Sequence, residues 1–335
     1  MSLRAIPFVC LLLALGGCKQ SSTNASAGQA PAAAPPAGTP VGVPYAPKMD
    51  DKIGLFPAKM KEGYGYIDKT GTVVIQPKFT GALAFSEGLA PAQDAQNRWG
   101  FIDKTGNFVI KPQYQSAIPF QEGLAPVRVG DQYACINRKG EIVIPAKFTA
   151  ISQFFDGLAA TLFEQNVGGT QVHGWGFIKP DGIFAIPPRY DAVGAFGNDL
   201  APVRVMARKW GYVDKQDKLV IQPDFEGANR FSEGLASVGT LAASGYKWGF
   251  INPQGKFAIA PQFDGARTFS EGLVGVMVKG QWGFADKTGK VVIQPKYQDV
   301  GQFTEGLALV MLGTKEKPQE SYIDTTGKTI WTEKL

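Results

Sequence analysis

Glutamates at five equivalent places are the residues whose type and spacing could do chemistry. Each lies in a Phe-Ser-Glu-Gly-Leu segment or a close variant, so each should occupy the same place in a repeated unit. Gathered in one array they could form a ring of carboxylates; alternatively, each binds backbone N–H groups in its own turn. Catalytic carboxylates work in pairs whose environments differ, which equivalence by repeat disfavours. These glutamates are Glu87, Glu122, Glu233, Glu271 and Glu305.

The single histidine, His173, is the other residue that could act in catalysis or bind a metal. It lies two residues before Trp175, with no cysteine cluster nearby and no G-x-S-x-G motif in the chain. The Gly-Lys-Thr sequence at 327–329 resembles the end of a phosphate-binding loop, but Tyr322 stands where that loop needs glycine. We therefore predict no catalytic residue, no metal site and no cofactor.

The three cysteines do not form a disulfide framework. Cys10 and Cys18 lie in the N-terminal leader, whereas Cys135 occupies a position at which other copies carry phenylalanine, as at Phe101 and Phe284. We expect Cys135 to be a small buried apolar residue; a reactive thiol is the alternative.

The elements that must position these residues are repeats. A Trp-Gly dipeptide, intact or worn, recurs eight times at intervals of 34 to 42 residues. A period of this length indicates an array in which each unit buries its apolar face against its neighbours. The intact dipeptides begin at Trp99, Trp175, Trp210, Trp248 and Trp282, and the worn ones at Tyr64, Tyr133 and Glu320.

Three strands can be assigned in each repeat, and a turn of the Asp-Lys-Thr-Gly type joins the second to the third. Its glycine should adopt a positive φ. In one copy Asp217 replaces that glycine, and in another Asp199 replaces the glycine of the Phe-Ser-Glu-Gly-Leu segment. Aspartate tolerates a positive φ, so both exceptions favour the assignment. The repeated aromatic residues should pack between neighbouring units, and stacking on a ligand is the alternative.

The first strand of each repeat carries small apolar residues, as at 124–129, and several copies have a proline in the middle. Because proline cannot donate to a ladder, this predicts a strand at a sheet edge, and the small side chains suggest that it lies nearest the axis of the array. The prolines are Pro91, Pro126 and Pro202.

Together these patterns predict an all-β fold with about eight three-stranded antiparallel units in residues 48–335. The strands should run from Leu55 to Trp331, with no helix longer than about two turns. The array is either a propeller-like ring or a short β superhelix. No strand is left over to complete a sheet at the other terminus, so a ring would lack a donor for strand exchange.

The N-terminus resembles a lipoprotein signal peptide. Residues 1–17 contain Arg4 and a short apolar run, and the Leu-Gly-Gly that precedes Cys18 resembles a bacterial lipobox. The resemblance implies that Cys18 becomes the lipidated first residue, and Lys19 after it implies sorting to the outer membrane. An ordinary secreted protein cleaved near Gly17 is the alternative. Residues 18–47 are rich in alanine, proline and serine, which predicts a disordered tether.

Charge argues against nucleic-acid binding. The formal net charge is +5, and lysine and arginine are distributed singly among glutamate and aspartate. A basic face is therefore not expected.

Three blocks, W-G-F-I-D-K-T-G, I-Q-P-K-[FY] and F-S-E-G-L-A, recur in order, as at 282–297 and 231–236, and residues 55–335 resemble the bacterial WG-repeat (KWG) family. The resemblance implies a β-rich repeat domain of secreted or surface-anchored proteins that mediates interactions, and it implies no catalytic residues. The chain departs from the pattern at 133–135, in a longer insertion before Trp175, and at Glu320.

These observations predict a lipid-anchored binding scaffold of the bacterial cell envelope. Its partner would be an unknown envelope protein or a cell-wall component, its membrane contact the lipid alone, and its state a monomer. The alternative is a hydrolytic enzyme with its site in the divergent third and fourth repeats, residues 131–175.

Overall fold

The computed structural model describes residues 54–334 except 168–169, 206–208, 243–244 and 315–316. The expected signal peptide (1–17), the lipidated Cys18 and the tether (18–47) lie outside the described residues. All regular structure in the described part is β-strand, as predicted. It contains no helix with the length and apolar character of a membrane span.

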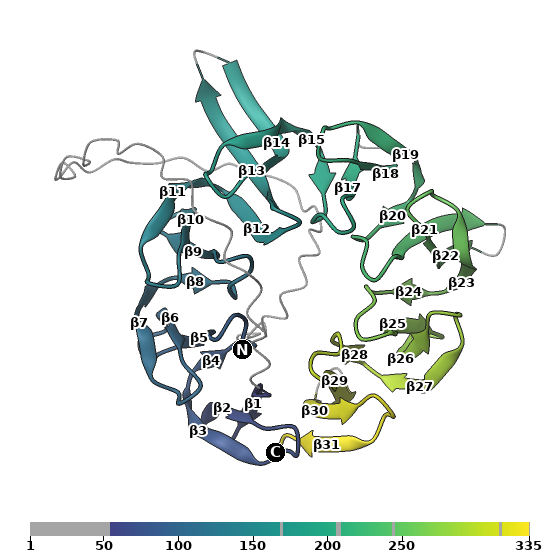
Figure 1. Cartoon of the computed structure of the whole chain (residues 1–335). Coiled ribbons are helices and arrows are strands. Elements are labelled where there is room, and N and C mark those ends of the chain that lie inside the picture. Colours follow the sequence, from purple (N-terminus) through teal and green to yellow (C-terminus); the bar gives the residue numbers. More distant parts are fainter. Residues whose placement is uncertain (1–53, 168–169, 206–208, 243–244, 315–316, 335) are drawn as a thin grey trace, which may run out of the picture. The chain divides into compact units, whose positions relative to one another are not determined.

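Eight antiparallel sheets follow one another around a closed ring, so the array is a β-propeller and not an open superhelix (Figure 1). We number the sheets as blades 1 to 8 in chain order. Blade 1 has three described strands and the other seven have four, so the prediction of three strands per unit is wrong for those seven. Within a blade the strands are ordered along the chain from the inside of the ring to the outside.

The innermost strands were missed because most of them contain only two residues. No alternation of apolar and polar side chains can show in so short a segment. They are β4 (Gly81–Ala82), β8 (Ser116–Ala117), β12 (Ala150–Phe155), β16 (Ala192–Val193), β20 (Gly227–Ala228), β24 (Gly265–Ala266) and β28 (Asp299–Val300).

The strand that the sequence placed nearest the axis is second in seven blades. It is not a sheet edge either: Pro126 pairs with Cys135 on one side and accepts an N–H from Ile118 on the other. The nitrogen of Pro126 faces the side where the neighbouring strand has already ended at Ala117, so no ladder bond is lost. These strands are β1 (Phe56–Met60), β5 (Ala90–Gln93), β9 (Ala125–Val129), β13 (Leu158–Val167), β17 (Ala201–Arg204), β21 (Ala236–Ala242), β25 (Leu273–Val278) and β29 (Leu307–Gly313).

The next strand carries the Trp-Gly dipeptide or its worn form, and the glycine faces backbone. A Cβ built on Gly283 would lie 2.4 Å from the carbonyl oxygen of Ile293, so a side chain there would require the outer strand to move. The two worn strands with a small side chain at this position have the buried Ala134 and Ser321. The strands are β2 (Gly63–Ile67), β6 (Trp99–Ile102), β10 (Gln132–Ile136), β14 (Thr170–Ile178), β18 (Trp210–Val213), β22 (Gly245–Ile251), β26 (Gln281–Asp286) and β30 (Pro318–Asp324).

The outermost strands form the rim of the ring. Their alternate isoleucine and aromatic side chains are buried, as Ile75 and Phe79 are, while the intervening Val74 is half exposed. The strands are β3 (Val73–Phe79), β7 (Phe108–Tyr114), β11 (Ile142–Phe148), β15 (Phe184–Tyr190), β19 (Leu219–Phe225), β23 (Phe257–Phe263), β27 (Val291–Tyr297) and β31 (Thr329–Thr332).

The Ser-Glu-Gly-Leu segment forms a tight two-residue turn between the two inner strands. Ser86 and Leu89 exchange backbone hydrogen bonds of 2.9 and 3.2 Å. Glu87 has φ of 52° and Gly88 has φ of 85°, the pair of positive values that a type I′ turn requires. A glutamate in this conformation is uncommon, so the position is specified by more than local preference.

The turn between the third and outer strands has the predicted left-handed residue. Gly106 has φ of 81° and donates to the carbonyl of Asp103 at 2.9 Å. Asp217 replaces this glycine in one copy and has φ of 65°, and Asp199, which replaces the glycine of the Ser-Glu-Gly-Leu turn, has φ of 63°, so both predictions are confirmed.

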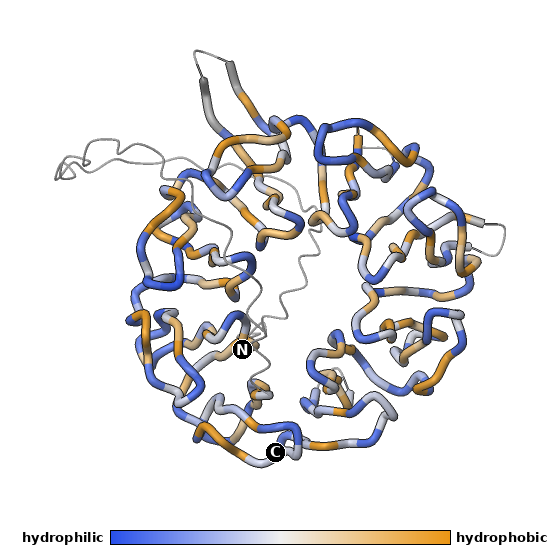
Figure 2. Tube along the Cα trace, viewed as in Figure 1, coloured by the Kyte–Doolittle hydropathy of each residue, from blue (hydrophilic) through white to orange (hydrophobic). Residues whose placement is uncertain are grey.

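The hydrophobic core lies between blades. An aromatic residue of the third strand packs on the phenylalanine that precedes the next blade's Ser-Glu-Gly-Leu turn; the ring centroids of Phe101 and Phe120 are 4.8 Å apart, and those of Phe284 and Phe303 also 4.8 Å. The prediction that these aromatics pack between units is confirmed, and Figure 2 shows the hydrophobic residues along the strands. The other pairs are Tyr66–Phe85, Phe177–Phe196, Tyr212–Phe231 and Phe250–Phe269.

Side chains close the ring where blade 8 packs on blade 1, and among the described residues no strand is shared between the two sheets. Phe56 of β1 packs on Tyr322 of β30, with ring centroids 5.6 Å apart. The hydroxyl of Tyr322 donates to the carbonyl of Pro57 at 2.9 Å. The N–H of Gly54 donates to the carboxylate of Glu305 at 3.0 Å. We call this contact between the last and first blades the closing seam.

Candidate functional site

The recurring glutamates bind backbone N–H groups, but those of the neighbouring blade. The carboxylate of Glu87 accepts the N–H of Gly123 at 3.0 Å, and that of Glu271 accepts the N–H of Gly306 at 2.9 Å. The expectation that each glutamate binds N–H groups of its own turn is wrong. In that turn the backbone groups of Ser86 and Leu89 already bond to each other. The remaining links join Glu122 to Gly157, Asp156 to Asp199, Asn198 to Gly234, Glu233 to Gly272 and Glu305 to Gly54.

These links connect seven of the eight junctions between blades. At the eighth, between blades 1 and 2, the equivalent residue is Ile53, which lies outside the described residues. Some carboxylates also pair with a lysine of a nearby turn: Glu305 lies 3.3 Å from Lys69, and Glu233 lies 3.1 Å from Lys287. The ring of carboxylates therefore holds blades together.

The Glu271→Ala variant should lose about 1–2 kcal/mol of stability, because it removes a charge-assisted hydrogen bond between blades. Glu271→Asn should lose less than about 0.5 kcal/mol, since asparagine accepts the same bond at Asn198 and tolerates a positive φ. Urea unfolding measures both. Equal stability of the two variants would show that the link contributes nothing.

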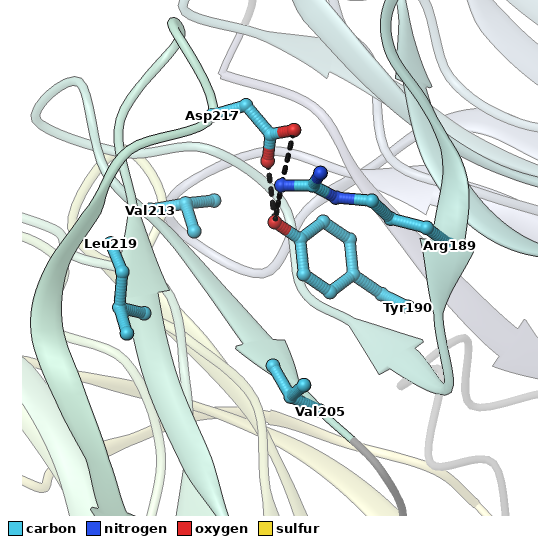
Figure 3. A pocket seen from close by; sticks show the side chains of 6 residues that line it. All are labelled: Arg189, Tyr190, Val205, Val213, Asp217 and Leu219. Carbon is cyan, nitrogen blue, oxygen red and sulfur yellow. Dashed lines mark hydrogen bonds and ion pairs between the residues drawn. The ribbon is translucent and has the colours of Figure 1, made fainter.

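A cavity of about 330 Å³ lies between blades 4 and 5. Its floor is apolar, and its polar side is formed by Arg189 and Tyr190 at the end of β15 and by Asp217 in the turn after β18 (Figure 3). The sequence singled out Asp217 for its backbone conformation and gave no sign of its carboxylate contacts. The apolar lining residues are Val205, Val213 and Leu219.

The polar groups of this cavity satisfy one another. The Nη2 of Arg189 lies 2.5 Å from an oxygen of Asp217 and donates to the Tyr190 hydroxyl at 3.1 Å. The Tyr190 hydroxyl donates in turn to Asp217. Burial and the bond to Asp217 raise the pKa of Tyr190. The triad joins two blades, and we interpret it as a structural contact.

The tryptophans of the repeats belong to the packing between blades. Trp175 is 6% exposed, and Trp99, Trp210, Trp248 and Trp282 are partly buried against the hydrophobic clusters. The Arg267 guanidinium stacks over the Trp282 ring at 4.6 Å. The predicted structural role is supported, although four of the five rings keep some contact with solvent.

Residues 131–175, which the alternative hypothesis made the site of an enzyme, form the outer part of blade 3 and the inner three strands of blade 4 as far as they are described. His173 is exposed and pairs across the hairpin with Glu164, its Nδ1 lying 2.8 Å from the carboxylate. The predicted burial of Cys135 is confirmed, and burial raises the pKa of its thiol to about 12. Among the described residues no group of three or more potential ligands is placed to hold a metal ion.

The connections between the second and third strands vary in length, unlike the other turns. Because neighbouring strands are antiparallel, these hairpins lie on one face of the ring, which we call the hairpin face, and the two kinds of tight turn lie on the other, the turn face. The strands β5 and β6 have 4 residues each, whereas β13 and β14 have 10 and 9 and extend beyond the rim (Figure 1). On another hairpin, Leu241 and Tyr246 form an exposed apolar pair.

Sequence analysis missed two buried carboxyl groups at the closing seam. Glu320, which stands where other copies have tryptophan or tyrosine, is 5% exposed, and Glu333 is 8% exposed. Burial, followed by the neighbouring Glu333 carboxylate, raises the pKa of Glu320 to about 7. The departure of Glu320 from the Trp-Gly pattern was visible in the sequence, but its burial depends on closure of the ring.

The fold has distant relatives among solved structures. A structure described as that of the eukaryotic initiation factor superposes with a TM-score of 0.54 at 12% sequence identity, covering 84% of this chain and 86% of that one. A quinonprotein alcohol dehydrogenase-like protein from Bacteroides thetaiotaomicron gives a TM-score of 0.43 at 12% identity, with coverages of 83% and 75%. At these identities the first likeness shows the fold alone.

No curated protein matches the chain. A family model described as "WG containing repeat" matches seven segments, 64–95, 99–133, 133–163, 175–205, 210–239, 248–282 and 282–315, which together cover more than half of the sequence. These segments contain the Trp-Gly strands and inter-blade turns described above, and the chain belongs to the WG-repeat family.

Proposed function

We propose that this protein is a lipid-anchored binding scaffold of the bacterial cell envelope, and that it holds an envelope protein or a cell-wall component against the hairpin face of its ring. It acts as a monomer, and its role is to bind and not to catalyse. The outer membrane is the proposed location, because Lys19 follows the lipobox cysteine.

The observation that carries the proposal is the contrast between the two faces. The turn face is uniform, since its turns keep the same length and the same links from blade to blade. The hairpin face differs from blade to blade in strand length and in exposed side chains. Loops that vary on a rigid scaffold are where binding residues are usually found.

The place where the chain enters the domain fits this orientation. Gly54 donates to Glu305 on the turn face, so the N-terminal segment joins the ring there. This face is opposite to the hairpins. A flexible tether of the 29 residues 19–47 has a root-mean-square span of roughly 30 Å, which would let the domain meet a partner at some distance from the lipid.

One experiment separates anchoring from binding. Full-length protein is compared with Cys18→Ala and with a trimmed variant in which residues 164–173 are replaced by Lys-Gly, the turn that β25 and β26 use at Lys279–Gly280. We expect wild type in the membrane fraction with a cross-linked partner. Cys18→Ala should become soluble and keep the partner, whereas the trimmed protein should stay in the membrane and lose it.

A Lys104→Ala, Thr105→Ala double variant on the turn face is the control and should keep both properties. If this control loses the partner and the trimmed protein keeps it, the partner binds the turn face and the proposed hairpin-face site is wrong. Membrane association that survives Cys18→Ala would contradict the lipid anchor.

A further inference from the structure

The closing seam is built differently from the other junctions. Blade 8 carries Glu320-Ser321 in place of the Trp-Gly dipeptide, so a carboxyl group stands where the other blades place a tryptophan or tyrosine ring. That carboxyl group is almost completely buried against blade 1. Because no described strand is shared across the seam, the side chains that meet there hold the two blades together.

Both buried carboxyl groups bind Lys59 of β1. Glu320 accepts the backbone N–H of Lys59. One oxygen of Glu333 lies 3.0 Å from the Lys59 ammonium, and the other accepts the N–H of Glu320 at 3.3 Å. The N–H of Glu333 donates to the carbonyl of Glu320 at 2.8 Å, so the last residues of the chain are held beside β30. Lys59 is therefore the centre of the contact.

The charges at the seam do not balance when both glutamates are ionised. Facing Glu320 are Lys59 from β1, Tyr64 from β2, Tyr322 from its own strand and Glu333 after β31, while β29 places the uncharged Met311 opposite it. Burial raises the pKa of both tyrosines, which stay neutral. Two carboxylates then face one ammonium group, and one bound proton makes the seam neutral.

We propose that the closing seam is a proton-controlled latch, in which a proton on Glu320 keeps the first and last blades together and its loss loosens them. The loss leaves a second negative charge beside Glu333 in a buried place that offers one ammonium group. The junctions between blades 2 to 7 do not involve Glu320, so loosening is confined at first to β1 and β30 at the closing seam. Blades 2 to 7 stay packed on one another.

The direction of the pH effect follows from linkage. The pKa of Glu320 is about 7 in the folded ring, above the ordinary value of 4.5. A carboxyl group with a raised pKa contributes stability that is fully present below about pH 4.5 and is lost as pH rises to about 7 and beyond. The seam is therefore tighter at mildly acidic pH than at mildly alkaline pH.

Hydrogen exchange of wild type and E320Q at pH 5.5 and pH 8 tests the latch. With intrinsic exchange rates corrected for pH, protection of β1 and β30 in wild type should fall by roughly 10-fold or more at pH 8. In E320Q, whose amide cannot ionise, it should change by less than about 2-fold. Protection of β18 should be equal at both pH values in both proteins.

E141Q, an exposed glutamate change in blade 3, is the matched control and should keep the wild-type response. If E320Q folds poorly, E333Q decides the question. It removes the neighbouring carboxylate that adds to burial in raising the pKa of Glu320 and leaves one carboxylate facing the Lys59 ammonium group, so the fall in protection between pH 5.5 and pH 8 should be smaller than in wild type. An E333Q response as large as that of wild type would contradict the latch. A wild-type seam without pH dependence, or an E320Q seam that responds like wild type, would overturn the proposal.

Discussion

Truncating Phe284 to alanine is expected to lower the free energy of unfolding by about 3–5 kcal/mol, the cost of removing a buried aromatic ring. Phe284 is 1% exposed and packs on Phe303 in the cluster between blades 7 and 8. The cavity would open inside a junction of the ring, where neither blade can close it without moving its sheet. Urea unfolding followed by tryptophan fluorescence measures the loss.

Trp282→Ala is the comparison within the same strand and should cost less than Phe284→Ala. The indole ring is partly exposed, and Arg267 covers part of it. The exposed part of a side chain contributes little to stability when it is removed. A larger loss for Trp282→Ala than for Phe284→Ala would show that the tryptophan of the Trp-Gly dipeptide, and not the phenylalanine two residues later, is the principal packing residue of the repeat.

Gly283→Ala is expected to cost about 3 kcal/mol, at the upper end of the range for overpacking a core. The added methyl group would lie 2.4 Å from the carbonyl oxygen of Ile293 and 2.7 Å from the nitrogen of Pro295. Both are backbone atoms of β27, so relief requires that the outer strand move away from β26 and weaken its ladder.

Gly301→Ala serves as the control for this prediction, because the nearest atom to its Cβ is the carbonyl oxygen of Leu309 at 3.3 Å and its φ is not left-handed. It should change stability by less than about 1 kcal/mol. Equal midpoints for the two alanine variants in urea would mean that β27 yields to the methyl group and that the Trp-Gly glycine has another purpose.

The sequence predicted those parts of the fold that depend on neighbours along the chain. The left-handed turn positions at Asp199 and Asp217 were recognised because glycine and aspartate share a tolerance for positive φ. The aromatic contacts between units were recognised because a residue such as Phe120 recurs once in each repeat, which a packing contact between identical units requires.

The links from acidic side chains to backbone N–H groups of the next blade were harder to predict, because they join residues 35 or more positions apart. The link from Glu87 to Gly123 cannot be distinguished in the sequence from a bond within one turn, and the link from Glu305 to Gly54 exists only because the ring closes. In the sequence, Glu320 looked only like a substitution in a worn Trp-Gly dipeptide. Its raised pKa comes from burial at the seam and from Glu333, neither of which a local pattern contains.

The way in which the described strands are divided among the blades also bears on how the gene can change. Each four-stranded blade is one unbroken stretch of chain, as with β4 to β7, residues 81–114, so duplication or deletion of a single repeat by unequal crossing-over divides no sheet. The new junction needs only an aromatic pair and a link from a polar side chain to a backbone N–H group, which most repeat units bring with them. The number of repeats in such a gene can therefore change by one at a time. The number of blades is limited by the angle between neighbouring blades that still allows the ring to close.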